Sequence, residues 1–375
     1  RLLLLAGLLL LCGAAAAQAG APAPMQRFAD ALAADDAGSA RFPVDAAARV
    51  ISLPDEWALS RPGIDTPLWY RLRFDAPGAR QSGAAIGLLI ERVCGNVAVQ
   101  LNGQLLHAAG SVQDPIALDC EQPLLLALPP ALLEANGNTI DLRLAGYALE
   151  QVASRQRAAA LSAPQIGAYD ALHALQRETV LVKAALPQLA SSALLMMGLV
   201  VVLLGWWQHR ERHLLYFGAL SIAWAAVTLR PWWHGAGLGR FVTEAALVSL
   251  ISLVALLAIK FLLHFARRRQ RQVTWLLVFQ ALLVPLSLVL AGPQQVHAVA
   301  SSWYLLFVIE ALLAVGYFLF VARVAQRRDF WPILALVLIT VVMIGIELAG
   351  QRWLLPTLWR TLPHVATPLA FVGMG

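Results

Sequence analysis

The sequence predicts a membrane protein made of an all-β jelly-roll sandwich followed by an all-α polytopic bundle of six complete spans plus a truncated seventh. Of 375 residues, 59% are hydrophobic and only 13% are charged, whereas a soluble domain carries about 25% charged residues. Residues 1–185 hold 14 Lys and Arg against 17 Asp and Glu, and 186–375 hold 14 against 5. These observations exclude a soluble cytoplasmic enzyme and a disordered chain. We interpret the basic balance of the apolar half as membrane orientation, not as nucleic-acid binding.

The N-terminus has the pattern of a secretory signal peptide. Arg1 precedes an apolar run over 2–11, and small residues lead to an Ala-Gln-Ala site that ends at Ala19. The run is too short for the roughly 20 residues of a membrane span. We therefore predict a signal peptide over 1–19, a flexible segment over 20–40 and export of the chain after Ala19. The first residue is not Met and the last lies in an apolar run, so we expect a piece of a longer protein.

Residues 41–162 are predicted to form one β-domain outside the cell. Short runs with period-two alternation are separated by turn residues, which is typical of an antiparallel sandwich or jelly roll. Asn102 and Gly103 lie between two such runs and predict a hairpin, since both residues tolerate a positive φ. The predicted strands are Leu68–Phe74, Ala85–Ile90, Val97–Leu101, Gln104–His107, Pro123–Leu128 and Thr139–Leu144.

Several segments of this domain carry a family resemblance: Ser52–Trp57, Trp69–Arg71, Phe74, Val99–Gly103 and Gly137–Ile140. In order and spacing they resemble the galactose-binding-like jelly roll, a module that fronts β-galactosidase-type glycosidases and many bacterial membrane receptors. The resemblance implies a small-molecule or carbohydrate-like ligand, with candidate contacts from Trp57, Trp69, Tyr70, Arg71 and Asn102. The alternative for the aromatic residues is core packing, and for Asn102 it is the turn alone.

Two cysteines remain after removal of the signal, and both lie in the exported domain. An even number in an oxidising compartment indicates a disulfide between Cys94 and Cys120. The alternative is two buried free thiols. No Cys-x-x-Cys and no His/Cys cluster with metal spacing is present in the sequence, so we predict neither a metal site nor a cofactor in this chain.

Residues 163–185 are predicted to be a helical connector, and 186–375 the membrane bundle. Apolar runs that can cross about 30 Å of hydrocarbon lie at 187–207, 213–229, 241–264, 273–291, 302–322 and 331–349, and a seventh begins near Pro363. If the first span starts outside, the loops predicted inside hold nine arginines and those outside hold four. This bias agrees with the positive-inside rule. We predict a bacterial inner-membrane protein, in contact with lipid, whose β-domain lies in the periplasm.

Ionisable residues within membrane spans are costly and are therefore functional candidates. Glu310 lies near a predicted midplane, as a relay partner or as an acid that fixes helix packing. Lys260 lies toward the inner end of its span, where it can snorkel. Glu244 and Glu347 lie near outer ends, where we expect them to contact water.

A signal peptide, a jelly roll, a connecting helix and seven spans resemble the bacterial seven-transmembrane receptors with diverse intracellular signalling modules. The resemblance implies a cytoplasmic module after the seventh helix, with histidine kinase favoured and diguanylate cyclase next. A kinase module would use ATP and Mg²⁺, would phosphorylate a cytoplasmic response regulator and would favour a homodimer. No residue of the present chain is predicted to be catalytic.

Two other functions stay open at this point. One is a transporter whose β-domain captures substrate, which requires polar residues or broken helices at the midplane. The other is a membrane-anchored carbohydrate-processing protein, which requires an acid pair in the exported half. The sequence shows little of either, and fold alone separates none of the three.

Overall fold

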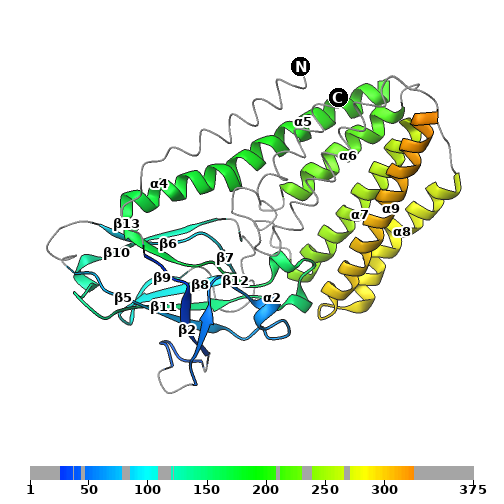
Figure 1. The fold of residues 1–375 in the computed structure, drawn as a ribbon. Helices are drawn as coiled ribbons and strands as arrows, with labels where there is room; N and C mark the ends of the chain where they lie inside the picture. The colour runs from blue at the N-terminus through cyan, green and yellow to red at the C-terminus, as the bar shows by residue number, and fades with distance from the viewer. Residues whose placement is uncertain are drawn as a thin grey trace.

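The computed structural model consists of a β-domain followed by a group of long helices (Figure 1). It describes residues 26–36, 38–43, 47–77, 85–108, 120, 122–207, 212–229, 239–265 and 271–324. The β-domain lies beside one end of the helices. The residues that follow its strand β11 lie against the ends of the helices closest to the β-domain (Figure 1).

The largest sheet has six strands in the order β3-β2-β5-β11-β8-β9, and neighbouring strands are antiparallel. Its strands are β2 (Asp30–Asp35), β3 (Arg49–Ser52), β5 (Leu68–Phe74), β8 (Asn96–Leu101), β9 (Gln104–Ala108) and β11 (Asn138–Ala145). Alternate residues of the three central strands point into one core, as the period of two requires. The inward set includes Leu68, Tyr70, Leu72, Phe74, Ile140, Leu142, Leu144, Val97, Val99 and Leu101.

A second sheet of four strands supplies the other side of this core. Its order is β1-β13-β6-β10, with β1 (Gln26–Arg27), β6 (Ile86–Ile90), β10 (Leu124–Leu128) and β13 (Gln165–Ala168). Leu88, Ile90, Leu128 and Ile166 of this sheet belong to the same core cluster as the inward residues of the large sheet. A small third sheet joins β4 (Asp55–Glu56), β12 (Ala160–Leu161) and β7 (Val93–Cys94). The domain is therefore an antiparallel β-sandwich, whereas its finer assignment as a jelly roll stays a prediction.

The strands predicted from alternation are present within one residue of their predicted ends. The predicted hairpin is also present, since Asn102 and Gly103 have φ values of 50° and 81° between β8 and β9. This pair of positive φ angles is what a two-residue hairpin turn requires.

Two domain boundaries differ from the prediction. Residues 20–40 were expected to be flexible, yet β2 lies between β3 and β5 inside the large sheet. Its buried side chains include Ala31, Ala33 and Ala34, which are too small to give a clear hydrophobic pattern. The connector 163–185 was expected to be helical throughout, but β13 takes its first part because its backbone pairs with β6.

The helical part begins directly after β13. Its elements are α4 (Tyr169–Val180), a π-helical turn η5 (Leu181–Ala185), α5 (Leu186–Trp207), α6 (Arg212–Thr228), α7 (Arg240–Phe265), α8 (Arg271–Ala291) and α9 (Val296–Val324). From Tyr169 to Trp207 the chain is one unbroken helical segment of 39 residues. This continuous helical segment, which we call the rod, therefore leads from the second sheet of the β-domain into the apolar helices.

Four helical segments are long and apolar enough to cross a membrane: Tyr169–Trp207, Arg240–His264, Arg271–Ala291 and Val296–Val321. The run expected over 213–229 forms the shorter apolar helix α6, whose 17 residues at about 1.5 Å each give less than the 30 Å hydrocarbon thickness. The described residues thus hold four candidate spans where five were predicted for the same stretch. The spans predicted at 331–349 and from Pro363 lie outside the described residues.

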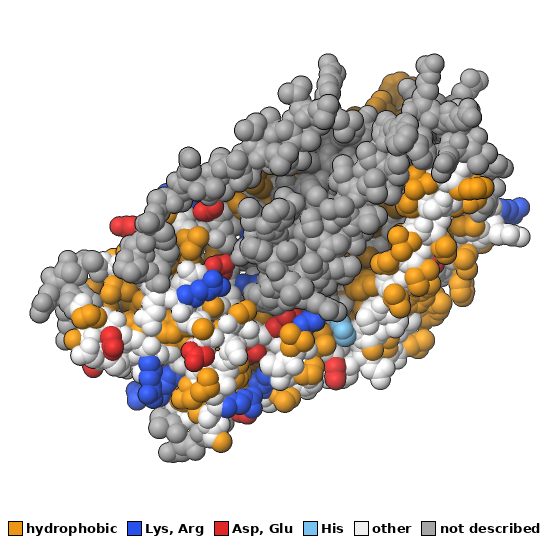
Figure 2. Space-filling model, viewed as in Figure 1, with side chains coloured by type: hydrophobic (Ala, Val, Ile, Leu, Met, Phe, Trp, Pro, Cys, Tyr) orange, Lys and Arg blue, Asp and Glu red, His pale blue; other side chains and the backbone are white. Residues whose placement is uncertain are grey.

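The outer surfaces of the helices are apolar. Large exposed side chains on α8 include Trp275, Leu276, Phe279, Leu282 and Leu290, each more than 60% exposed. Figure 2 shows hydrophobic side chains over the described helices and charged ones gathered on the β-domain. An apolar surface of this size does not face water in a soluble protein, which marks the chain as a membrane protein.

Helices α5 and α6 pack closely through glycine. A Cβ placed on Gly218 would lie 2.8 Å from the backbone oxygen of Gly198 and 2.8 Å from the backbone nitrogen of Val202. Small residues allow such approach between helices in a membrane, where packing replaces the hydrophobic effect as the driving force.

We expect Gly218→Ala to destabilise the helical part by about 1–3 kcal/mol, because the methyl group meets backbone atoms that cannot rotate away. Gly316→Ala on α9 is the matched control, since a Cβ there would meet nothing within 4 Å. Thermal unfolding of the purified protein in detergent measures both. Equal midpoints for the two variants would show that the α5–α6 contact is not tight.

Candidate functional site

The predicted aromatic platform lies in the core of the β-domain. Trp57 and Tyr70 each have 0% of their surface exposed. The Trp57 Nε1–H donates to the Tyr70 hydroxyl at 2.9 Å, and that hydroxyl donates to Oδ2 of Asp55 at 2.6 Å. Burial, and then the charge of Asp55, raise the pKa of Tyr70 well above its usual value. Neither ring offers a face to a ligand in this conformation, in agreement with the core-packing alternative.

Trp69 and Arg71 lie on the opposite face of the large sheet. Trp69 is fully buried, and its Nε1–H donates to Oδ1 of Asp36 at 3.1 Å. Arg71 forms a bidentate pair with Asp141 across the β5–β11 ladder, with N···O distances of 2.6 and 2.9 Å, and its guanidinium lies 4.1 Å from the ring centre of Phe42. These contacts hold the segment that contains Asp36 and Phe42 against this face of the large sheet.

Asn102 fastens the hairpin to the neighbouring loop. Its Nδ2 donates to the carbonyl oxygen of Leu132 at 2.7 Å and to Oδ1 of Asn138 at 3.0 Å. Its Oδ1 accepts the backbone N–H of Thr139 at 2.8 Å. Both ends of the amide are thus used within the domain, which fits the turn alternative.

The intramembrane polar residues are paired in two places. The Gln280 Nε2 on α8 donates to Oε2 of Glu310 on α9 at 3.0 Å. Lys260 on α7 donates to the hydroxyl of Thr274 on α8 at 2.7 Å. Both pairs join neighbouring helices, as expected for polar groups in an apolar surrounding. Glu347 lies outside the described residues.

Cys94 and Cys120 form a disulfide that closes a separation of 26 residues. In the chain-entropy model such a loop stabilises by roughly 3–4 kcal/mol. The two cysteines form a small buried cluster with Ala160, separate from the main core. The bridge therefore joins β7 to Cys120, which belongs to none of the strands.

The structure assembles a site that sequence patterns did not indicate, in the 3₁₀ turn η4 (Arg155–Arg157). Each of its three residues is fastened to a different element. Arg155 pairs with Glu56 of β4 at 2.8 Å. The carbonyl oxygen of Gln156 accepts a hydrogen bond from Nη2 of Arg92 at 2.6 Å and lies beside the disulfide. Arg157 reaches out of the β-domain to helix α7.

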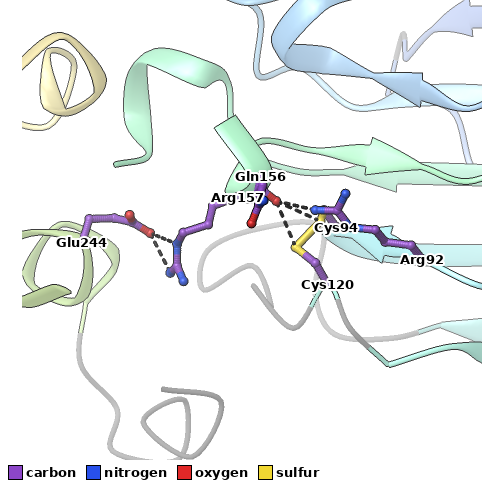
Figure 3. Close-up of a disulfide and its surroundings, with 6 residues drawn as sticks. All are labelled: Arg92, Cys94, Cys120, Gln156, Arg157 and Glu244. Atoms are coloured by element: carbon purple, nitrogen blue, oxygen red, sulfur yellow. Dashed lines mark hydrogen bonds and ion pairs between the residues drawn. A yellow bond between two sulfur atoms is a disulfide. The ribbon is translucent and has the colours of Figure 1, made fainter. Parts of the chain in front are cut away.

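Arg157 and Glu244 form the central contact between the β-domain and the helices (Figure 3). The Nε–H of Arg157 donates to Oε1 of Glu244 at 2.7 Å, and the Nη2 atom lies 2.7 Å from the same oxygen. The second carboxylate oxygen accepts the backbone N–H of Ala153 at 2.8 Å. The two charged side chains are 3% and 0% exposed, so this is a buried ion pair, in which Nε of Arg157 donates a hydrogen bond and Nη2 makes only the charge contact.

A second contact lies one helical turn earlier on α7. Nη1 of Arg240 donates to Oε1 of Gln151 at 2.9 Å, and its guanidinium lies 4.6 Å from the ring centre of Tyr147. Nε2 of Gln151 donates to Asp65 at 2.8 Å. Because Arg240 and Glu244 are four residues apart, they share one face of the helix. We call the contacts of Arg240 and Glu244 with the β-domain the junction.

Apolar packing seals the junction. Ala153 of the β-domain is 1% exposed and lies in a cluster with side chains of the helices: Val248, Val284, Leu288, Val296, Ala300 and Phe307. A charge pair in such surroundings loses its hydration, so its attraction and hydrogen bonds must offset a penalty of several kcal/mol per ion. Breaking it by removing one partner leaves a buried unpaired charge.

Sequence reasoning placed Glu244 incorrectly. It was expected to contact water at the outer end of a span, but it is fully buried by residues of the β-domain. The signal that could have found the pair was an acid in the first turns of an apolar helix together with a basic turn in the β-domain, Arg155-Gln156-Arg157. Such a signal names no partner, because the two charges are 87 residues apart.

Within the described residues, no group of three or more His, Cys, Asp or Glu side chains could hold a metal ion. The junction holds charges in fixed positions but brings no nucleophile and base together. What it can do chemically is transmit a displacement or a change of charge from the β-domain to α7.

No family model and no curated protein matches the chain. Among solved structures it is similar to a glycosyl hydrolase family 2 member from Bacteroides cellulosilyticus, at 18% identity and a TM-score of 0.30, covering 38% of this chain and 20% of that one. It is also similar to a β-glucuronidase from Ruminococcus gnavus, at 13% identity and a TM-score of 0.30, covering 40% and 30%.

A third such structure is a β-galacturonidase from Eisenbergiella tayi bound to galacturonate, at 10% identity and a TM-score of 0.28, covering 39% of this chain and 24% of that one. The chain therefore spans between a fifth and a third of the length of these enzymes. TM-scores near 0.3 are too low for such likenesses to assign a function.

The buried Tyr70 predicts an alkaline dependence of stability. Because its pKa is raised in the folded state, its contribution is complete below the usual tyrosine value of 10.0 and is lost as pH rises from there through the folded-state pKa. Tyr70→Phe should cost about 1–3 kcal/mol, since it leaves the buried Asp55 without its donor. Tyrosinate absorbance should show one of the six tyrosines ionising only as the domain unfolds, and Tyr70→Phe should remove that step.

We expect Arg157→Met to destabilise the seating of the β-domain by about 3–5 kcal/mol, because Glu244 stays buried without its counter-charge. Adding Glu244→Leu should recover most of the loss. Arg155→Met is the matched control, since its pair with Glu56 is 26% exposed on the arginine side and 6% on the glutamate side, and its loss should therefore cost less than the loss of Arg157, whose pair is closed to water on both sides. Denaturant unfolding of the four proteins measures this, and equal losses for Arg157→Met and Arg155→Met would contradict it.

Proposed function

We propose that the chain is the sensing part of a transmembrane signal receptor. Its β-domain lies in the periplasm and binds a small-molecule or carbohydrate-like ligand. Its helical bundle crosses the inner membrane and passes the resulting change to a cytoplasmic signalling module. Among output modules, histidine kinase is favoured and diguanylate cyclase comes next, on the family resemblance of the sequence.

One observation carries this proposal: the buried junction through Arg157 and Glu244. A domain that only captured ligand near a membrane would need no buried charge pair with a helix. The β-domain is attached to the apolar helices twice, covalently through the rod Tyr169–Trp207 and non-covalently through the start of α7. A displacement of the domain on its rod therefore acts directly on α7.

The energies involved suit a two-state switch. A ligand shifts an equilibrium only by the difference between its affinities for the two states. Separating the pair lets both charges hydrate, so it costs less than the roughly 3–5 kcal/mol of removing one partner; even that upper value requires a preference of only roughly 10²- to 10⁴-fold, at 1.4 kcal/mol for each factor of ten. A ligand bound at about 1 μM has about 8 kcal/mol of binding free energy, so a part of it is sufficient.

The same proposal sets the partners. A kinase module would use ATP and Mg²⁺, act in a homodimer and phosphorylate a response regulator in the cytoplasm. Membrane lipid would cover the exposed apolar side chains of α8 and α9. The intramembrane pair of Gln280 and Glu310 joins those two helices and would move with them.

The test uses the chain reconstituted in lipid nanodiscs, with a cysteine-reactive environment-sensitive dye at Arg268→Cys in the predicted inner loop. D-galactose and D-glucuronate are added as probes, and binding is followed separately by calorimetry. We expect a bound sugar to change the dye emission in the wild-type background. In the Arg157→Met background the sugar should still bind, but the change in emission should be lost.

Sugar binding without any change at the inner loop would contradict a relay through the bundle. An equal change in wild type and in Arg157→Met would contradict the role of the junction. Uptake of labelled sugar by proteoliposomes that contain the protein would replace the receptor with the transporter alternative.

A further inference from the structure

The Cys94–Cys120 disulfide contacts the same turn, η4, that carries Arg157 of the junction. Its two sulfur atoms are 3.6 and 3.8 Å from the carbonyl oxygen of Gln156, which also accepts the hydrogen bond from Nη2 of Arg92 at 2.6 Å. Figure 3 shows the bridge and Arg92 on one side of Gln156, and Arg157 reaching from the same turn to Glu244 on the other side. One peptide unit therefore lies between the disulfide and the buried ion pair.

The bridge also fixes the strands around this turn. Cys94 belongs to β7, which pairs with β12, and β12 begins three residues after η4. Cys120 packs on Ala160 of the same strand. The disulfide thus packs against β12, the strand that follows η4, and η4 in turn positions Arg157.

The main core of the β-domain does not contain the bridge. The 25 buried residues of that core include neither cysteine, and the two sulfurs form a separate cluster. Loss of the bridge would therefore act on η4 and the junction before it acts on the two facing sheets.

We propose that the contact between the β-domain and the helical bundle through the junction depends on the oxidation state of Cys94 and Cys120. This inference rests on the proposed receptor function and names a redox input to it. A dithiol reductant would break the S–S bond, supply two electrons and two protons, and become a disulfide itself. In the oxidised protein the Arg157–Glu244 pair is formed, which we call the latched state, and in the reduced protein this pair is broken, which we call the unlatched state.

Two physical changes unlatch the reduced form. Two thiol sulfurs cannot stay at bonding distance, so the pair of sulfurs that packs against the Gln156 carbonyl of this turn moves apart. Each new S–H is also a weak donor next to the Gln156 carbonyl, where it competes with Arg92. Because an ion pair buried to this extent requires tight geometry, a small shift of Arg157 is sufficient to expose Glu244.

The backbone amide of Ala153 reports the latch, since its N–H is bonded to Glu244. Hydrogen exchange is measured on the full chain in nanodiscs, oxidised and after treatment with dithiothreitol. We expect the protection of the Ala153 amide to fall by about tenfold or more on reduction, as for a local opening. The amide of Leu142 in β11 exchanges only when the whole domain unfolds, so in the reduced protein it should stay much more protected than the amide of Ala153, although loss of the bridge lowers the stability of the whole domain.

The Cys94→Ala/Cys120→Ala variant reproduces the loss of the bridge without thiols, and it should show the same loss at Ala153 and no response to dithiothreitol. Unchanged protection of Ala153 in this variant and in the reduced protein would overturn the proposal. Equal protection of Ala153 and Leu142 in the reduced protein would also overturn it, because both amides would then open only when the whole domain unfolds. In oxidised Glu244→Leu, normal protection of Ala153 would instead overturn the junction, and with it the proposed relay.

Discussion

The burial of Arg157 and Glu244 against each other is the constraint on which the rest of the arrangement depends. Neither charge can leave the other without a penalty of several kcal/mol, because both are shielded from water by apolar side chains of the bundle and by Ala153. The pair therefore fixes where the β-domain lies along α7. It also makes the interface specific, since an apolar contact alone would tolerate sliding.

This contact acts together with a second attachment on the other side of the β-domain. Leu172 of α4 is fully buried, with its Cδ1 atom 3.3 Å from where a Cβ on Gly87 of β6 would lie, so α4 packs closely on this strand. Lys183 in the π-helical turn lies 3.8 Å from Glu91. The helical segment on the second sheet and the Arg157–Glu244 pair near the third sheet hold the domain at two separate points. A tilt of the domain about one of these points therefore displaces the other.

Local patterns in the sequence were sufficient for much of the fold. Alternation gave strands such as Leu68–Phe74 at their observed bounds, and Asn102-Gly103 gave its hairpin, because both depend on neighbouring residues. The strand Asp30–Asp35 was missed since alanines carry little hydrophobic signal, and the run over 213–229 was counted as a full span, whereas the described helix α6 has 17 residues. The aromatic residues Trp57 and Tyr70 have the same composition whether they face a ligand or a core, and only packing separates the two.

By itself, the sequence determined the class of each segment: which strands alternate, which helices are apolar enough for lipid, and which two cysteines share the β-domain. These properties arise from side-chain chemistry and from periods of two or 3.6 residues along the chain. Only the tertiary structure decided the partners. Glu244 meets Arg157 across 87 residues and the disulfide lies behind Gln156, because burial and charge pairing depend on which surfaces meet, and no local period encodes that.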